Sequence, residues 1–366
     1  MNNTTLKKVW RFIDTPYDTL MDCDAYYSGD PNASLALCIT SSMVGAISIY
    51  ILPFICIFGI ITNIYIGYVF LYEFKKLSRQ SIYMSLICWS DSITILFLGI
   101  LWMIPAKGLP FASEGRIYYF IIYESVELCR FYRGIYSLTS TLASNLLLLT
   151  SIDRCLCIYY PLKYRTIPVY YAWYLIGGVS FISFLCVLPV IILVDFHDIG
   201  TFTTCWLHES QAFLQIFIIL FNNAGFIQTI VILVLNIIFM IKMRKTFTKE
   251  RLADPQSIES KEWSASVILF ILSTTLLLFS LPQCAAYLAA FFFPSVMEKS
   301  QSEQSVRLAY NIADIAWQCI FAQNASAIFV CWQRMQEFRQ VFYRLFLKGP
   351  LQPLRKYVNE AQSTTH

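Results

Sequence analysis

The sequence carries little charge for its length, and this lack excludes most soluble proteins. Charged residues make up only 14% of the 366 residues, whereas hydrophobic residues make up 57% and the mean hydropathy is +0.57. Soluble globular chains carry about 25% charged and roughly 45–50% apolar residues. A soluble domain of this composition lacks enough polar residues to cover its surface. Disordered, collagen-like and coiled-coil chains are excluded by the same numbers, and we expect a polytopic membrane protein.

Histidine and the common catalytic motifs are also scarce. There are three histidines, His197, His208 and His366, and none lies in an apolar stretch. The sequence contains no HExxH, GxSxG or GxxxxGK[ST] motif, and its 12 cysteines include no CxxC pair. Metalloprotease, hydrolase, P-loop and zinc-ribbon interpretations therefore have no support. We expect no enzymatic activity, no metal or organic cofactor and no nucleic-acid partner.

Long apolar runs are what the sequence does contain. A membrane-spanning helix needs about 20 mostly apolar residues. Seven segments meet this requirement, at about 43–72, 80–104, 126–152, 170–194, 211–241, 263–293 and 308–332. We predict an all-α membrane protein in which residues 43–332 form a seven-helix bundle. Residues 1–42 are expected to be an outer tail without a cleavable signal peptide, and residues 333–366 a tail on the other side.

The distribution of charge predicts which end of the bundle faces the cytoplasm. Eighteen of the 27 lysines and arginines fall in the segments that share a side with the C-terminus. Cytoplasmic loops carry an excess of these residues, so the N-terminus is expected outside the cell, in the plasma membrane. Sequons at Asn2, Asn3 and Asn32 agree with this orientation as candidate glycosylation sites.

Short motifs inside the spans occur in a recognisable order. The first span contains Asn63, and the second contains Asp91, the only acidic residue deep within a predicted span. The third span ends in Asp153-Arg154-Cys155. The sixth contains Pro282, which follows Glu262 by 20 residues. In this order the motifs resemble those of the rhodopsin-like (class A) G-protein-coupled receptors.

The resemblance implies further features and also has exceptions. It implies a disulfide between Cys129 and Cys205, and an amphipathic eighth helix that starts near Glu337-Phe338-Arg339. In the sixth span, however, Ser280 replaces the usual tryptophan. When the chain is aligned with the family so that the eighth helices coincide, Ile328, Phe329 and Trp332 occupy the positions of the family's Asn, Pro and Tyr in the seventh span.

A narrower resemblance concerns one branch of the family. Leu281-Pro282-Gln283 and the Asn-Ser-Ser-x-x-Phe type of seventh span are similar to invertebrate FMRFamide and myosuppressin-like peptide receptors. This similarity implies an extracellular neuropeptide as the ligand. A chemosensory receptor for small molecules remains an alternative, because the replaced motif residues show that the sequence departs from the family pattern. A seven-helix transporter or channel is the alternative from another class, although it would need several ionisable residues along its conduit.

Arg154 is the centre of the predicted switch. Its guanidinium is always charged and costly to bury near the inner mouth of a bundle unless it is paired. Asp153 and Glu262 are the candidate partners, and release of Arg154 would expose it to a heterotrimeric G protein. Pro282 should kink the sixth helix, and Trp332 occupies the family's tyrosine position in the switch. The simpler interpretation is a juxtamembrane salt bridge.

Asp91 is the centre of a second expected network, since an ionisable residue inside the membrane is a functional hypothesis by default. In the family this aspartate belongs to a sodium-binding network. Here Ala143 replaces the serine of the third span, and a sodium ion would find too few oxygens. We expect hydrogen bonds from Asn63 and Asn324 to Asp91 instead.

A ligand pocket is predicted from residues that share helix faces near the outer end. Aromatic walls with a few polar groups suit a small molecule or the end of a peptide. The candidates are Tyr132, Arg133, Tyr136, Ser140, Gln283, Tyr287, Asp314 and Gln318. Asp314 and the acidic outer loops would attract a cationic, amidated peptide. The expected partners are thus an extracellular peptide or small molecule, a heterotrimeric G protein and the lipid bilayer.

Overall fold

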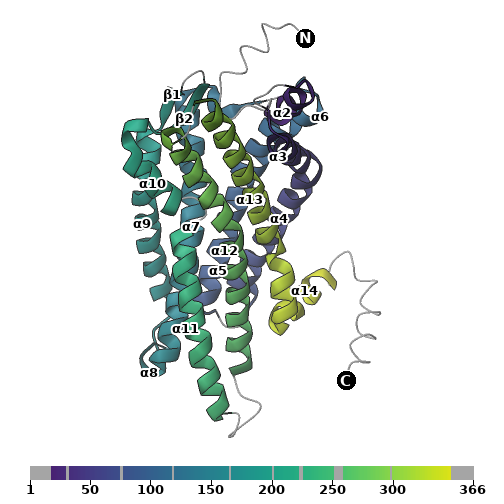
Figure 1. The fold of residues 1–366 in the computed structure, drawn as a ribbon. Coiled ribbons are helices and arrows are strands. Elements are labelled where there is room, and N and C mark those ends of the chain that lie inside the picture. Colours follow the sequence, from purple (N-terminus) through teal and green to yellow (C-terminus); the bar gives the residue numbers. More distant parts are fainter. Residues whose placement is uncertain are drawn as a thin grey trace.

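The chain forms an elongated bundle of helices that run between two ends (Figure 1). The computed structural model describes residues 18–29, 33–74, 77–117, 119–164, 166–199, 202–221, 226–250, 259–296 and 299–347. Within these residues, seven helices are long and apolar enough to cross a membrane: Leu35–Glu73, Arg79–Ala112, Val126–Tyr159, Tyr171–Leu193, Ala212–Lys242, Thr274–Phe293 and Gln304–Gln333. The predicted seven-helix bundle is confirmed.

Several of these spans are built from consecutive segments. In chain order the helices are α2 (Asp18–Tyr27), α3 (Leu35–Ala46), η1 (Ile47–Ile51), α4 (Leu52–Tyr68), η2 (Val69–Glu73), α5 (Arg79–Thr94), η3 (Ile95–Gly108), α6 (Leu109–Ala112), η4 (Ile121–Tyr123), α7 (Val126–Tyr159), α8 (Pro161–Tyr164), α9 (Tyr171–Leu193), η5 (Glu209–Gln211), α10 (Ala212–Phe221), α11 (Phe226–Glu250), α12 (Glu259–Val296), α13 (Lys299–Arg334) and α14 (Gln336–Leu347).

A two-stranded hairpin marks one end of the bundle. Strands β1 (Asp195–Ile199) and β2 (Phe202–Trp206) pair antiparallel, with Phe196 opposite Cys205. We refer to this end as the hairpin end. The opposite end carries α8, and α14 lies at the side of the bundle toward it (Figure 1).

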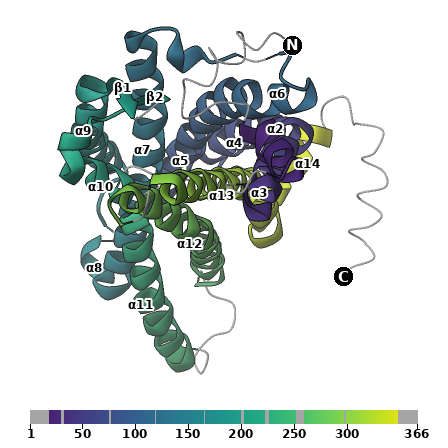
Figure 2. The same cartoon turned by 45° about the horizontal axis from the view of Figure 1, so that its top comes forward.

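The first span begins earlier than the sequence predicted. Helix α3 starts at Leu35 because the Ser34 hydroxyl caps it by accepting a hydrogen bond from the Leu37 amide at 3.2 Å. The short helix α2 precedes it, so the predicted outer tail of residues 1–42 is partly helical. Both helices lie beside the hairpin-end half of α13 (Figure 2). The three predicted glycosylation sites, Asn2, Asn3 and Asn32, lie outside the described residues.

The second span continues past its predicted end at residue 104. Pro105 and Lys107 indicate a helix end in the sequence, but η3 keeps π-helical hydrogen bonding through both and passes into α6. A proline lacks the amide hydrogen of a regular helical bond, and π-helical turns accommodate such a position. Lys107 is only 5% exposed. Its burial depends on an ion pair with α13 that the sequence did not reveal.

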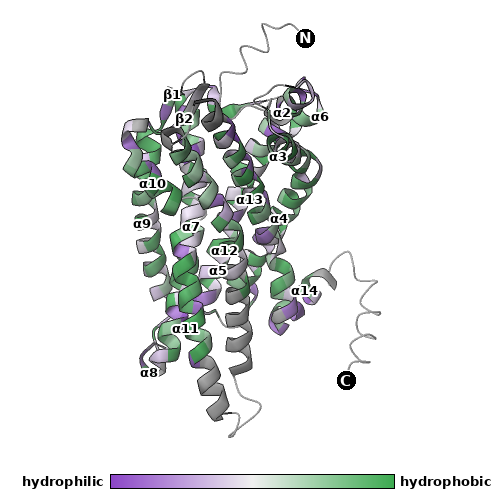
Figure 3. Cartoon of the chain, in the orientation of Figure 1, coloured by the Kyte–Doolittle hydropathy of each residue, from purple (hydrophilic) through white to green (hydrophobic). Residues whose placement is uncertain are grey.

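Apolar side chains both fill the interior and cover the outside of the bundle, as they do in membrane proteins. Two buried clusters fill the interior, one toward the hairpin end around Trp317 and Phe321 and one toward the opposite end around Tyr83 and Phe338. Large apolar side chains also cover the outside, among them Phe54 at 74% and Tyr174 at 72% exposure. Most of α4, α9 and α10 is hydrophobic (Figure 3). In water such a surface would aggregate, whereas lipid tails accommodate it.

The amphipathic helix expected after the seventh span is α14. Its Phe338 is fully buried and Val341 nearly so, both within the cluster at the opposite end. Arg344 on its polar face forms an ion pair with Glu73 at 2.6 Å. The eighth helix is therefore held to the first span by apolar packing and by one charged contact.

Candidate functional site

The end of α7 carries the predicted switch residues at the end of the bundle opposite the hairpin. Asp153 and Arg154 are each 7% exposed. Asp153 forms its ion pair with Arg79, the first residue of α5, at an N–O distance of 3.0 Å. Arg154 donates a hydrogen bond from Nη2 to the side-chain oxygen of Gln80 at 2.9 Å. Helix α5 thus supplies a partner to each of the two residues, and the predicted pairing of Arg154 with Asp153 or Glu262 stays a prediction.

Arg79 also contacts the end of α8 and the chain just after it. Its Nη1 donates to the backbone carbonyls of Tyr164 and Ile167, both at 3.1 Å, and its Nη2 donates to the sulfur of Cys157 at 3.3 Å. Helix α5 begins here because the Ser78 side chain accepts a hydrogen bond from the Ser81 amide at 3.1 Å. The sequence analysis missed Arg79, which looked like one more basic residue beside a span. The sequence did contain one indication of its position, because Arg79 directly follows Ser78, a residue type that caps the start of a helix.

The other predicted switch residues lie on α12 and α13. Glu262 lies in α12, but its side chain is outside the described residues. Pro282 also lies in α12, and the helix runs without a break from Glu259 to Val296. Trp332 packs edge-on against Phe342 of α14, with ring centroids 4.5 Å apart. Trp332 therefore connects the seventh span to α14.

Asn63, Asp91 and Asn324 line one cavity of about 70 Å³ in the middle of the bundle. Ser140 also lines this cavity. The expected hydrogen bond from Asn63 to Asp91 is not formed, because the amide nitrogen of Asn63 is buried without a partner among the described residues. The lining of the cavity is mainly apolar, and these polar side chains are set within it. The three residues are thus neighbours around one cavity, without the expected hydrogen bond from Asn63.

Two disulfides shape the hairpin end. Cys129 at the start of α7 is bonded to Cys205 in β2, the pair that the resemblance implied. Arg130, the next residue of α7, donates from Nε to the carbonyl of Val194 at 2.8 Å and lies 3.3 Å from the carboxylate of Asp195. The hairpin is therefore fastened to α7 at three neighbouring points.

Arg133 lies among aromatic rings directly beneath this hairpin. Its guanidinium carbon is 5.1 Å from the ring centre of Trp206 in β2 and 5.5 Å from that of Trp102 in η3. It also donates a hydrogen bond to the hydroxyl of Tyr136 at 2.9 Å. Tyr132 is buried with its ring 5.4 Å from that of Phe97. The part of the predicted pocket that lies on α7 is thus brought together, with two tryptophans that were not predicted from the sequence.

The residues predicted on the seventh span face other helices. Asp314 lies 3.9 Å from the ammonium group of Lys107. Gln318 is 3% exposed and donates hydrogen bonds to the Ser48 hydroxyl at 2.9 Å and to the Val44 carbonyl at 3.4 Å. These two residues hold α13 against the first and second spans. Their place in the ligand pocket stays a prediction.

The sixth span contributes Gln283 and Tyr287. Gln283 is fully buried, and neither its amide oxygen nor its amide nitrogen has a hydrogen-bond partner among the described residues. Tyr287 packs edge-on against Tyr310 of α13 at 6.0 Å, beside an alanine-rich contact between α12 and α13. Residues of α12 and α13 thus approach one another near this point.

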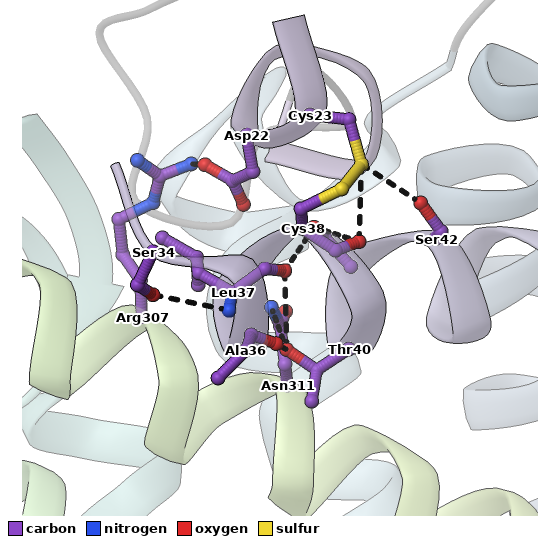
Figure 4. A network of polar contacts seen from close by, with 11 residues as sticks. Asp22, Cys23, Ser34, Ala36, Leu37, Cys38, Thr40, Ser42, Arg307 and Asn311 are labelled. Carbon is purple, nitrogen blue, oxygen red and sulfur yellow. Dashed lines mark hydrogen bonds and ion pairs between the residues drawn. A yellow bond between two sulfur atoms is a disulfide. The ribbon is translucent and has the colours of Figure 1, made fainter. Parts of the chain in front are cut away.

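A polar network joins the N-terminal helices to α13 (Figure 4). Arg307 forms an ion pair with Asp22, whose side chain is 3% exposed. Asn311, one turn further along α13, donates to the Thr40 hydroxyl at 3.3 Å. The disulfide Cys23–Cys38 ties α2 to α3 beside these contacts. A seam thus runs along α13, from Arg307 against α2, through Asn311 and Asp314, to Gln318 against the first span.

Comparison with known families agrees with this architecture. The profile of the family described as 7 transmembrane receptor (rhodopsin family) matches residues 62–321, which is more than half of the chain. The matched region starts within α4, ends within α13 and includes the α7 residues described above. No curated protein sequence matches the chain.

Proposed function

Because the chain belongs to the seven-transmembrane receptors of the rhodopsin family, which are receptors and not enzymes, we propose that it binds an extracellular neuropeptide and activates a heterotrimeric G protein. In this proposal the hairpin end faces outward. The opposite end, with α8 and α14, faces the cytoplasm. The excess of lysine and arginine in the segments on the C-terminal side supports this orientation.

The observation that carries the proposal is the environment of Arg154. A guanidinium is kept almost completely buried at one end of an apolar bundle, and its described hydrogen bond goes to the neutral amide of Gln80. A partner that inserts polar groups at this end would compete with Gln80 for Arg154. A G protein that docks there is such a partner.

The ligand is proposed to enter beneath the hairpin. Arg133, Tyr136 and Trp206 combine a cation, a hydroxyl and aromatic surface close to the hairpin. Such a mixture suits a peptide end that carries an aromatic side chain. The ion pair between Lys107 and Asp314 removes the main reason to expect a cationic ligand. The proposal is therefore for a peptide, with no requirement for positive charge.

A peptide screen tests this proposal. Cells that express the receptor and a G-protein activation reporter are exposed to amidated peptides, to the same peptides with a terminal carboxylate, and to small volatile and water-soluble compounds. A response to peptides that is absent from untransfected cells and from cells with Arg154→Ala supports the proposal. A response restricted to the small compounds contradicts the peptide part. A response that persists in Arg154→Ala contradicts the role of Arg154.

A further inference from the structure

Two histidines from different elements meet at the hairpin end. His197 lies in β1, and His208 caps the short helix η5, which leads into the fifth span. Their ring centres are 5.0 Å apart, and the two ring planes are inclined by 83°. No sequence motif pointed to this pair, because the two residues become neighbours only when the hairpin folds back beside the start of the fifth span.

The nitrogen atoms of the two rings have different surroundings. Nε2 of His197 is buried and has no hydrogen-bond partner among the described residues. Nearly all buried polar atoms in proteins have a partner, and water or a bound ion supplies it where the protein does not. His208 is exposed, and its Nδ1 lies 2.8 Å from the hydroxyl oxygen of Ser210 and 3.2 Å from the Ser210 amide nitrogen. Because Ser210 engages Nδ1 of His208, Nε2 is the nitrogen of that ring that can bind a ligand.

The separation of the two rings fits a shared metal ion. Zinc binds imidazole nitrogens at about 2.0–2.1 Å with tetrahedral geometry, which places the centres of two imidazoles on one ion roughly 5 Å apart. The observed separation of 5.0 Å agrees with this value. An edge-to-face contact of two aromatic rings has a similar spacing. Such a contact, however, supplies no conventional hydrogen bond to the buried Nε2 of His197.

We propose that His197 and His208 bind a zinc ion at the hairpin end, through Nε2 of each ring. Within the part of the chain that the structure describes, no group of three or more His, Cys, Asp or Glu side chains could hold a metal ion. The ion therefore has two protein ligands, and water completes its coordination. Nδ1 of His208 then donates its hydrogen to the Ser210 hydroxyl, the kind of outer-shell hydrogen bond that orients metal-binding histidines. This site depends neither on G-protein coupling nor on the identity of the extracellular ligand.

A metal ion at this position adds an attachment to the hairpin. The disulfide Cys129–Cys205 and the contacts of Arg130 fasten the hairpin to α7. The two histidines instead join β1 to the segment that leads into the fifth span. Strand β2 pairs with β1 and carries Trp206, which lies against the guanidinium of Arg133. Zinc should therefore slow the hydrogen exchange of β1, β2 and η5.

Isothermal calorimetry with zinc chloride tests the site in receptor that is purified without a histidine tag and held in lipid nanodiscs. We expect saturable binding in the natural chain. Loss of an outer-shell partner costs about 10–100-fold in metal affinity, and loss of a ligand should cost at least as much. His197→Gln and His208→Gln should each weaken binding by about tenfold or more, and Ser210→Ala should weaken it by about tenfold. His366→Gln, which changes the third histidine of the chain, is the matched control and should bind zinc as the natural chain does.

Two further controls separate this site from other metal ligands. Magnesium prefers oxygen ligands and should not bind here. Free cysteines such as Cys155 and Cys157 also bind zinc, so the titration is repeated after alkylation of the thiols. Because His208 is exposed, His208→Gln should fold like the natural chain.

The proposal predicts that zinc binding survives alkylation and is lost in His197→Gln/His208→Gln, together with the slower hydrogen exchange of the hairpin. Absence of zinc binding by the natural chain, unchanged binding in the double variant, or loss of binding on alkylation alone would overturn it. Failure of the receptor to activate a G protein would contradict the proposed function and would leave the zinc result unaffected.

Discussion

Arg307, in the first turns of α13, forms an ion pair with Asp22 in α2, although 285 residues separate them in the chain. The carboxylate is almost fully buried, whereas Arg307 is 22% exposed. This contact lies at the hairpin end of a seam that continues along α13 to Gln318. The N-terminal helices are thus part of the bundle and not an independent tail.

Removal of one partner of this ion pair should destabilise the receptor. Asp22→Asn or Arg307→Gln leaves the other charge without its buried counterpart, which typically costs about 3–5 kcal/mol. We expect the thermal midpoint of the purified protein to fall in each single variant, and the double variant to be less destabilised than the sum. The exposed pair Arg116–Glu114 is the control, since its side chains are 78% and 82% exposed. Strict additivity of Asp22→Asn and Arg307→Gln would show that the pair contributes nothing.

The disulfide Cys23–Cys38 should add to the same attachment. It closes a short loop with a sequence separation of 15 residues, for which chain-entropy arguments give roughly 3 kcal/mol. Cys23→Ser/Cys38→Ser should therefore expose α2 to limited proteolysis and speed hydrogen exchange at the start of α13. Mass spectrometry of unreduced peptides should find the two cysteines joined. Detection of both as thiols in the natural protein would refute the pairing.

Two buried glutamines should respond in opposite ways to the same substitution. Gln318→Leu removes hydrogen bonds to Ser48 and Val44, so it should lower the thermal midpoint. Gln283→Leu removes an amide that has no partner among the described residues, and an unsatisfied buried amide costs about 1–3 kcal/mol. Gln283→Leu should therefore leave the midpoint unchanged or raise it. A midpoint that falls equally in both variants would contradict this difference.

The sequence predicted the seven spans because lipid imposes a length and a polarity that show in a single chain. It also predicted Asn63, Asp91 and Asn324 as neighbours, since the resemblance supplied their relative positions, and the structure does place all three around one cavity. The expected hydrogen bond between Asn63 and Asp91 was wrong in detail. A bond of that kind depends on side-chain rotamers, and a sequence does not specify them.

Partner choice is what the sequence could not provide. Arg79 and Lys107 both looked like basic residues at the ends of spans, yet each pairs with an acid from a distant helix, Asp153 and Asp314 respectively. Lys107 reaches Asp314 only because η3 continues past Pro105. Such pairings depend on the packing of several helices, and local patterns of hydrophobicity carry no information about them.

The most direct test of the account is the rate of nucleotide exchange that the receptor induces in a heterotrimeric G protein in lipid nanodiscs, compared between the natural chain and Arg154→Ala. Both forms are first matched for the amount of folded receptor by their thermal midpoints and their yields. The account predicts that the natural receptor accelerates exchange above empty nanodiscs and that Arg154→Ala abolishes the acceleration. Equal acceleration by the two forms, or none by the natural receptor in the presence of any peptide from the screen, would contradict it.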